Sequence, residues 1–164
     1  MGVLKGSDPT LAAEAVVFSA HYDGFGVIRK AIYNGVADNA IGVAEMLSVA
    51  EAFARLKLKP RRSLVFIAFT AEEYALLGSR HFVAHATWDL ARTAAVLNLD
   101  GIGTEIMGPM NSMVAYGAPF SSLGPMFLDA ARAYASDRWT TPSPRRACSA
   151  DRTTTRSSNG ACLA

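Results

Sequence analysis

The chain of 164 residues has few cysteines, few charged residues and no long apolar run. Its two cysteines, Cys148 and Cys162, both lie close to the C-terminus, so they say little about the redox compartment of the fold. No run of about 18 apolar residues exists, and no hydrophobic stretch follows the first nine residues. Neither a membrane span nor a signal peptide is therefore expected, and the sequence predicts a soluble chain without a membrane partner.

What the sequence does contain favours a folded domain. Hydrophobic residues make up 51% of the chain and charged residues only 18%, which excludes an intrinsically disordered protein and suits largely buried strands. A length of 164 residues is enough for one domain with a core and too short for two ordinary ones.

The net charge of +2 depends on the end of the chain. The last 29 residues hold five arginines against two aspartates, and without them 11 basic residues face 12 acidic ones. Because nucleic-acid binding needs a basic face rather than a basic tail, no nucleic-acid partner is expected. We predict an ordered core over residues 1–135 and an irregular tail over residues 136–164.

Within the core, strand-like and helical patterns alternate. Apolar runs predict strands at 15–20, 63–69 and 93–99, and helical spacing of apolar residues predicts helices at 39–58, 72–86 and 121–134. The run at 63–69 is typical of a central strand covered on both faces. This order predicts an α/β fold, a three-layer sandwich around a mostly parallel sheet.

Acidic residues and a histidine follow the three predicted strands, where parallel sheets gather their ligand sites. Together with an aspartate before the first helix, they could converge on one edge of the sheet. Such a group would repel itself unless cations neutralised it, and a mixed shell of imidazole and carboxylate suits zinc or another divalent transition metal. The residues are His21, Asp23, Asp38, Glu72, Glu73 and Asp100.

Four motifs containing these residues resemble the M28 family of zinc metallopeptidases. The resemblance implies an incomplete zinc-aminopeptidase-like fold, two neighbouring zinc ions, a peptide substrate and removal of N-terminal residues. The motifs are Ala-His-Tyr-Asp at 20–23, Tyr-Asn-Gly-Val-Ala-Asp-Asn-Ala-Ile-Gly at 33–42, Phe-Thr-Ala-Glu-Glu-Tyr-Ala-Leu-Leu-Gly-Ser at 69–79 and Asn-Leu-Asp-Gly-Ile-Gly at 98–103.

The same resemblance assigns a role to each residue. It implies that His21 and Asp100 bind one zinc ion and Glu73 the other, with Asp38 bridging them. Glu72 becomes the general base, which takes a proton from water and passes it to the leaving amine. Asp23 should accept the second imidazole N–H of His21 and fix its tautomer.

Each residue also has a structural interpretation. His21 or Asp100 could be an ordinary turn residue, and the Asp38–Asn39 pair could cap the following helix. The two glutamates could form a solvated helix start that the helix dipole favours. His81 and His85 have a spacing that can chelate zinc on a helix, but Phe82 stands where a zincin has its catalytic glutamate, so a surface pair is predicted.

The sequence departs from the family pattern near its end, where one more zinc-binding histidine is expected and none is present. Reading the third base of each codon with the first two of the next, residues 150–163 permit Arg-Ser-Asp-His-Tyr-Pro-Phe-Val-Lys-Arg-Gly-Val-Pro. We hypothesise a one-base frameshift upstream of Cys148, which removes this imidazole, weakens the zinc site on the Glu73 side and impairs the peptidase activity of this chain. We also expect the start of the chain to be incomplete.

Two further functions stay open. The chain could be a non-catalytic or vestigial module that retains the fold. It could also be an acyltransferase similar to glutaminyl cyclases, which share the fold and a similar metal cluster. The Asp38 bridge and the Glu72–Glu73 pair favour the peptidase.

Overall fold

A computed structural model describes residues 1–101 and 115–134. The chain divides into two compact units, Met1–Gly103 and Thr104–Ala164, which are described separately. The predicted tail over residues 136–164, with its hypothesised frameshift, lies outside the described residues. The division between core and tail at residue 135 therefore stays a prediction.

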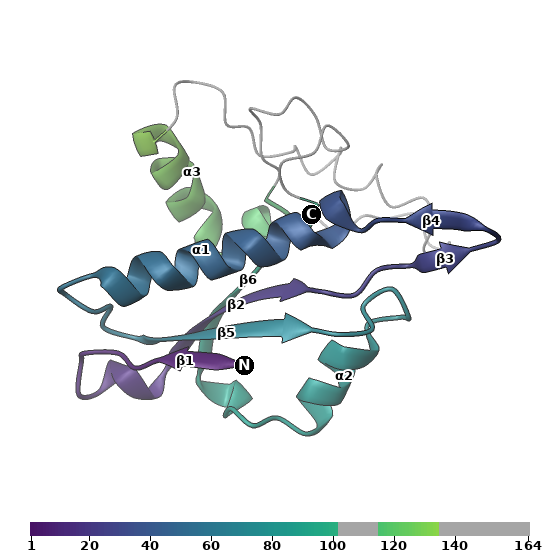
Figure 1. Cartoon of the computed structure of the whole chain (residues 1–164). Coiled ribbons are helices and arrows are strands. Elements are labelled where there is room, and N and C mark those ends of the chain that lie inside the picture. The colour runs from purple at the N-terminus through teal and green to yellow at the C-terminus, as the bar shows by residue number, and fades with distance from the viewer. Residues whose placement is uncertain (102–114, 135–164) are drawn as a thin grey trace, which may run out of the picture. The chain divides into compact units, whose positions relative to one another are not determined.

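The first unit is built on a four-stranded sheet in the order β1-β5-β2-β6 (Figure 1). Its strands are β1 (Gly2–Leu4), β2 (Ala15–His21), β5 (Ser63–Phe69) and β6 (Thr93–Asn98). β2 is parallel to both β5 and β6, whereas β1 is antiparallel to β5. The three predicted strands and the mostly parallel sheet are confirmed, and β1 is an addition too short to show a periodic pattern.

Alternate side chains of each strand point to opposite faces of the sheet, and both faces carry apolar side chains. Helices therefore pack on both faces. On one face lies α1 (Ile41–Arg55) (Figure 1). Its Phe53 ring is 6.3 Å from that of Phe18 in β2. On the other, α2 (Leu77–Ala84) brings Phe82 to 5.8 Å from Phe69, above a core that includes the buried residues Val17, Val65 and Ile67. The mixed α/β architecture is thus present, and the complete three-layer sandwich stays a prediction.

Two helix boundaries differ from their predictions. The first helix, expected at 39–58, is α1 at Ile41–Arg55, preceded by a turn at Val36–Ala40 in which Asp38 and Asn39 have non-helical backbone angles. The second, expected at 72–86, begins only at Leu77, so the prediction was wrong for its first turn. The cause is the left-handed backbone conformation of Ala71, Ala75 and Leu76, which interrupts the helix before Leu77.

A β-hairpin that was not predicted leaves the first unit between β2 and α1. Its strands, β3 (Gly26–Ile28) and β4 (Ala31–Tyr33), pair only with each other and project as an arm (Figure 1). The turn between them is formed by Arg29 and Lys30, both with positive φ. Because Arg and Lys are not the residues that usually mark such turns, the hairpin could not be recognised from its turn residues.

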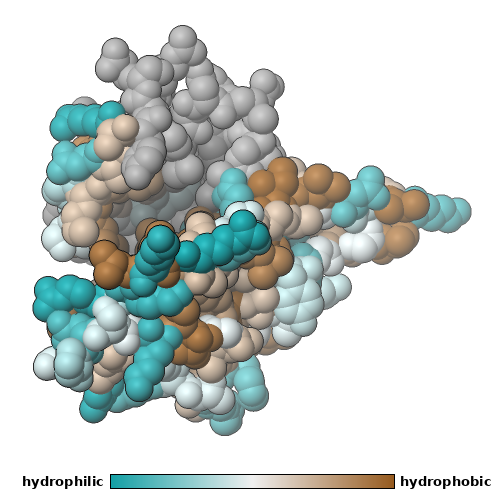
Figure 2. All heavy atoms as spheres, turned by 60° about the vertical axis from the view of Figure 1, so that its left-hand side comes forward, coloured by the Kyte–Doolittle hydropathy of each residue, from teal (hydrophilic) through white to brown (hydrophobic). Residues whose placement is uncertain are grey.

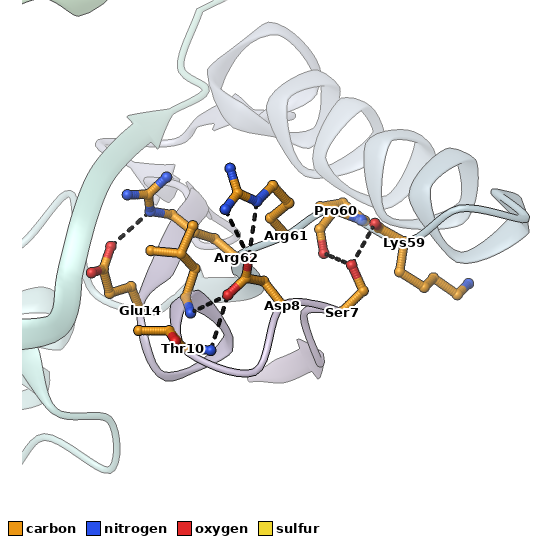
Figure 3. A network of polar contacts seen from close by, with 9 residues as sticks. Ser7, Asp8, Thr10, Glu14, Lys59, Pro60, Arg61 and Arg62 are labelled. Carbon is orange, nitrogen blue, oxygen red and sulfur yellow. Dashed lines mark hydrogen bonds and ion pairs between the residues drawn. The ribbon is translucent and has the colours of Figure 1, made fainter.

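The amino ends of β2 and β5 are joined by a network of polar contacts (Figure 3). The Asp8 carboxylate accepts hydrogen bonds from the Arg61 guanidinium at 2.8 and 3.0 Å and from the backbone N–H of Thr10 and Leu11. Arg62 donates to Glu14 at 2.7 Å. Each acid at this edge therefore has a basic partner.

The second unit contains the helix predicted at 121–134, which is confirmed as α3 (Leu123–Tyr134). A 3-10 turn at Ala118–Phe120 precedes it. Ala118 and Ala131 are its buried apolar residues among those described. Within residues 1–101 and 115–134, no helix combines the length and the apolar character needed to cross a membrane.

Candidate metal centre

Three side chains from separate elements meet at the carboxyl edge of the sheet. His21 is the last residue of β2, Asp100 follows β6, and Asp38 lies in the turn before α1. The Nε2 atom of His21 lies 3.0 Å from Oδ1 of Asp38 and 3.6 Å from Oδ1 of Asp100. One ligand atom from each residue falls within 4.8 Å of the other two, so the three could hold one metal ion.

The condition of His21 fits a metal ligand. Its side chain is only 3% exposed, and neither ring nitrogen has a well-directed hydrogen bond with any described residue. Leaving buried polar atoms unpaired costs stability, so such a residue calls for a partner. A divalent cation would be bound by the lone pair of a ring nitrogen and would neutralise the two carboxylates. Imidazole together with carboxylate is a common ligand set of zinc. The residues present therefore fit the metal.

The backbone holds these ligands at the edge. The N–H of Leu99 donates to the Ser19 carbonyl at 2.8 Å, which continues the pairing of β6 with β2 as far as Asp100. The N–H of Tyr22 likewise donates to the Phe69 carbonyl at 2.9 Å and extends the pairing of β2 with β5 beyond His21. The parallel pairing, whose register on the β6 side shifts only between Ala15 and Val16, is thus what brings the strand ends together.

Asp23 fastens the turn that carries the two glutamates. Its Oδ1 accepts from the backbone N–H of Glu72 at 3.0 Å and its Oδ2 from that of Glu73 at 3.3 Å. Burial alone would raise the pKa of Asp23, but these backbone hydrogen bonds lower it. Asp23 Oδ1 also lies 3.6 Å from His21 Nδ1, longer than a hydrogen bond, so its predicted role as acceptor for the imidazole stays a prediction.

This turn explains why no helix begins at Glu72. Ala71, Ala75 and Leu76 all have φ between 53° and 62°, a left-handed conformation that interrupts a right-handed helix. At Gly78 a Cβ atom would lie 2.1 Å from the Thr70 carbonyl oxygen, so the first turn of α2 can pack closely only with glycine there. The interpretation of the glutamates as a helix start favoured by the dipole is therefore wrong.

The two glutamates lie close to the other acids of the site. Burial raises the pKa of Glu72, and the charges of Asp100, Asp38 and Asp23 raise it further, whereas His21 lowers it. Burial likewise raises the pKa of Glu73. Oε1 of Glu73 is buried without a hydrogen-bond partner among the described residues, although Glu73 is not in the group of three possible ligands.

The acids in turn act on His21. Burial lowers the pKa of its imidazole, but the charges of Asp100, Glu72, Asp38 and Asp23 outweigh it and raise the pKa above its ordinary value. The imidazole thus lies among several acidic groups at this edge, and such a surrounding favours a bound cation.

Asn39 also supports the site, and the sequence analysis considered it only as one of a capping pair with Asp38. Its side chain is buried, with Oδ1 accepting from the Gly42 N–H at 3.1 Å and Nδ2 donating to the Leu99 carbonyl at 2.9 Å. Asn39, and not Asp38, therefore makes the capping contact of α1 and ties it to the strand end before Asp100. The sequence signal was its position beside Asp38, where only a general cap was considered.

Two features adjoin the centre. A cavity of about 350 Å³ lies between the sheet and α2, with His21 and Glu72 among its mostly apolar lining residues. His81 lies at an exposed position of α2 and His85 at the exposed position that follows the helix, with ring centroids 4.4 Å apart. They form a surface pair, as predicted, and contribute nothing to the group of three ligands.

Comparisons with known proteins all point to peptidases. The profile of peptidase family M28 matches residues 1–155. Aminopeptidase YwaD of Bacillus subtilis is 39% identical over 94 residues, 56% of this chain and 19% of that protein. A vacuolar membrane protease of Clavispora lusitaniae is 36% identical over 100 residues, 61% of this chain and 9% of that protein.

A probable glutamate carboxypeptidase of Arthroderma benhamiae is 30% identical over 119 residues, 70% of this chain and 15% of that protein. The chain thus spans less than a fifth of the length of each of these three relatives. Because the family profile covers nearly the whole chain, including all six residues discussed above, the chain belongs to peptidase family M28.

Proposed function

We propose that the chain is the catalytic core of a zinc-dependent peptidase of the aminopeptidase type. The observation that carries this proposal is the meeting of His21, Asp38 and Asp100, with a buried imidazole whose ring nitrogens have no hydrogen-bond partner among the described residues. Membership of a peptidase family supports the reaction class. Similarity to a bacterial aminopeptidase supports the choice of exopeptidase over endopeptidase.

In this proposal the side chains divide into ligands and a base. His21, Asp38 and Asp100 hold one zinc ion, which when bound would polarise the scissile carbonyl and make water a stronger nucleophile. Glu72 accepts a proton from the attacking water and returns it to the amine nitrogen as the carbon–nitrogen bond breaks. Asp23 positions Glu72 by holding the backbone of its turn.

Glu73 provides a carboxylate for a second zinc ion, with Asp38 shared between the two sites. The buried and unpaired Oε1 of Glu73 supports this assignment. Since no histidine follows His85 in the sequence, the second site has fewer protein ligands than the first. We therefore propose a tight first site and a weak second one. We further propose that the whole core takes the three-layer sandwich predicted from sequence.

Metal analysis combined with hydrolysis tests this function. The purified chain should contain zinc, and it should release the chromophore from a chromogenic amino-acid amide. Glu72→Gln should abolish turnover while retaining zinc, because it removes the base and leaves the three ligands. Glu45→Gln, in the half-buried part of α1, is the matched control and should retain both zinc and turnover.

Other outcomes would point to the remaining functions. A folded chain without zinc and without turnover would support a non-catalytic module. Cyclisation of an N-terminal glutamine, in place of hydrolysis, would support a glutaminyl-cyclase-like acyltransferase. Turnover that survives in Glu72→Gln would contradict the assignment of the base.

A further inference from the structure

The hairpin β3–β4 exposes apolar side chains on a surface that nothing in the described chain covers. Val27 and Ile32 are directly opposite each other across the two strands, and they are 68% and 73% exposed. On the other face the Phe25 ring packs edge-on against Tyr33 with centroids 5.7 Å apart. Figure 2 shows hydrophobic surface extending along this arm. We call the exposed pair the Val27–Ile32 face.

This hairpin starts and ends at the metal centre. The chain enters it directly after Asp23 and leaves it just before Asp38. At its base, a Cβ atom on Gly24 would lie 3.8 Å from both the Gly35 Cα and the Asp38 carbonyl oxygen. The two ends of the hairpin are therefore close together beside a metal ligand, and the arm rises from the same edge of the sheet as the proposed catalytic residues.

The tip of the hairpin is basic. Arg29 and Lys30 form the turn, both are exposed, and neither makes an ion pair with any described residue. Three residues of extended strand span roughly 10 Å, so the apolar pair and the basic tip lie within the reach of a short peptide bound at the site.

We propose that the hairpin binds the part of a peptide substrate that extends beyond the cleaved bond, with apolar residues against the Val27–Ile32 face and acidic residues at Arg29 and Lys30. This inference rests on the proposed peptidase function and adds a substrate class to it. Each hairpin strand has one edge without a strand partner among the described residues, and an extended peptide can pair with such an edge through its backbone.

A second copy of the chain fits the surface less well. A stable protein–protein interface buries about 800 Å² on each partner, and one face of a hairpin with three residues in each strand offers only a fraction of that. A second copy would also bring a further Arg29 and Lys30 to a tip that is already basic. A short acidic and apolar peptide matches both the size and the charge.

Fluorescence anisotropy with a labelled peptide tests this without requiring turnover. The probe is Ala-Ala-Leu-Val-Glu-Glu with a fluorophore at its C-terminus, bound to the zinc-loaded Glu72→Gln variant. Two pairs of substitutions are each added to this variant, V27S with I32S and R29E with K30E. Each pair should weaken binding of the labelled peptide by about tenfold or more. Leu58→Ser and Lys57→Glu, at exposed positions beyond α1, are matched controls that should bind as the parent does.

The outcomes separate the two proposals. Peptide binding that depends on the hairpin supports the inference, whether or not the wild-type chain hydrolyses amides. A failure of the wild-type chain to hydrolyse amides would count against the proposed function alone. Equal binding by the parent and both hairpin variants overturns the inference, as does the absence of binding by any of them. A dimer in sedimentation velocity that V27S with I32S dissociates also overturns it, because the face would then be an interface between copies.

Discussion

The two ends of β2 and β5 differ in how their charges are balanced. At the amino edge, Asp8 is paired with Arg61 and Glu14 with Arg62 (Figure 3). At the carboxyl edge, Asp23, Asp38 and Asp100 all face a single imidazole among the described residues. Acids that are paired with arginines are neutralised within the protein, whereas an excess of acids around one histidine repels itself unless a cation neutralises it. The carboxyl edge is therefore arranged for a ligand, and the amino edge for structure.

Removing the histidine should change the carboxyl edge more than any other substitution. His21→Ala deletes the only imidazole in the group of three ligands, so zinc affinity should fall by more than the roughly 10–100-fold that loss of an outer partner of a ligand costs. Isothermal titration of the metal-free chain with zinc measures this. His81→Ala removes an exposed imidazole and serves as the control, and an equal loss in both variants would contradict the assignment.

Loosening the turn that holds the glutamates should have the next largest effect. Asp23→Ala removes the acceptor for the backbone N–H groups of Glu72 and Glu73, and we expect the free energy of unfolding to fall by about 2–3 kcal/mol. Urea denaturation measures this loss. Asp23→Asn keeps one acceptor oxygen and should lose less. Equal stability of Asp23→Ala and the wild type would show that the turn does not depend on this carboxylate.

The smallest effect is expected at the amino edge and concerns pH. The N–H of Leu11, then Arg61 and the N–H of Thr10, lower the pKa of Asp8 from 3.8 to about 2. A lowered pKa means that Asp8 stabilises the fold fully above pH 3.8 and that this contribution is lost as the pH falls through about 2. Denaturation midpoints between pH 4 and 2 should therefore drop less in Asp8→Asn than in the wild type. Equal drops would show that the network does not hold this charge.

The elements that were predicted correctly are those in which apolar residues recur regularly along the chain. Burial produces this pattern, both in the apolar runs of β2, β5 and β6 and in the amphipathic spacing of α1 and α3. The start of α2 was mispredicted because left-handed residues such as Leu76 and the contacts of Asp23 leave no periodic trace. The hairpin was missed because Arg29 and Lys30 are not turn residues by propensity.

The candidate site was predicted through strand ends and family motifs rather than through contacts. Parallel pairing explains why His21 and Asp100 meet, and this could be anticipated from the order of the strands. The capping of α1 by the Asp38–Asn39 pair was considered and is made by Asn39, but the contact of Asn39 with the Leu99 carbonyl and the backbone contacts of Asp23 depend on tertiary packing and could not be anticipated. The hypothesised frameshift concerns residues outside those described, and resequencing the gene across its final 30 codons would test it.

X-ray absorption at the zinc edge shows which histidine binds the metal, using the zinc-loaded wild type and a zinc-loaded variant with both His81 and His85 changed to alanine. If His21, Asp38 and Asp100 hold the zinc, both proteins give the same spectrum, with one imidazole nitrogen at about 2.0–2.1 Å and carboxylate oxygens completing the shell. A shell of two imidazoles that disappears in the double variant, or a shell of oxygen alone, would show that these three residues do not hold the zinc.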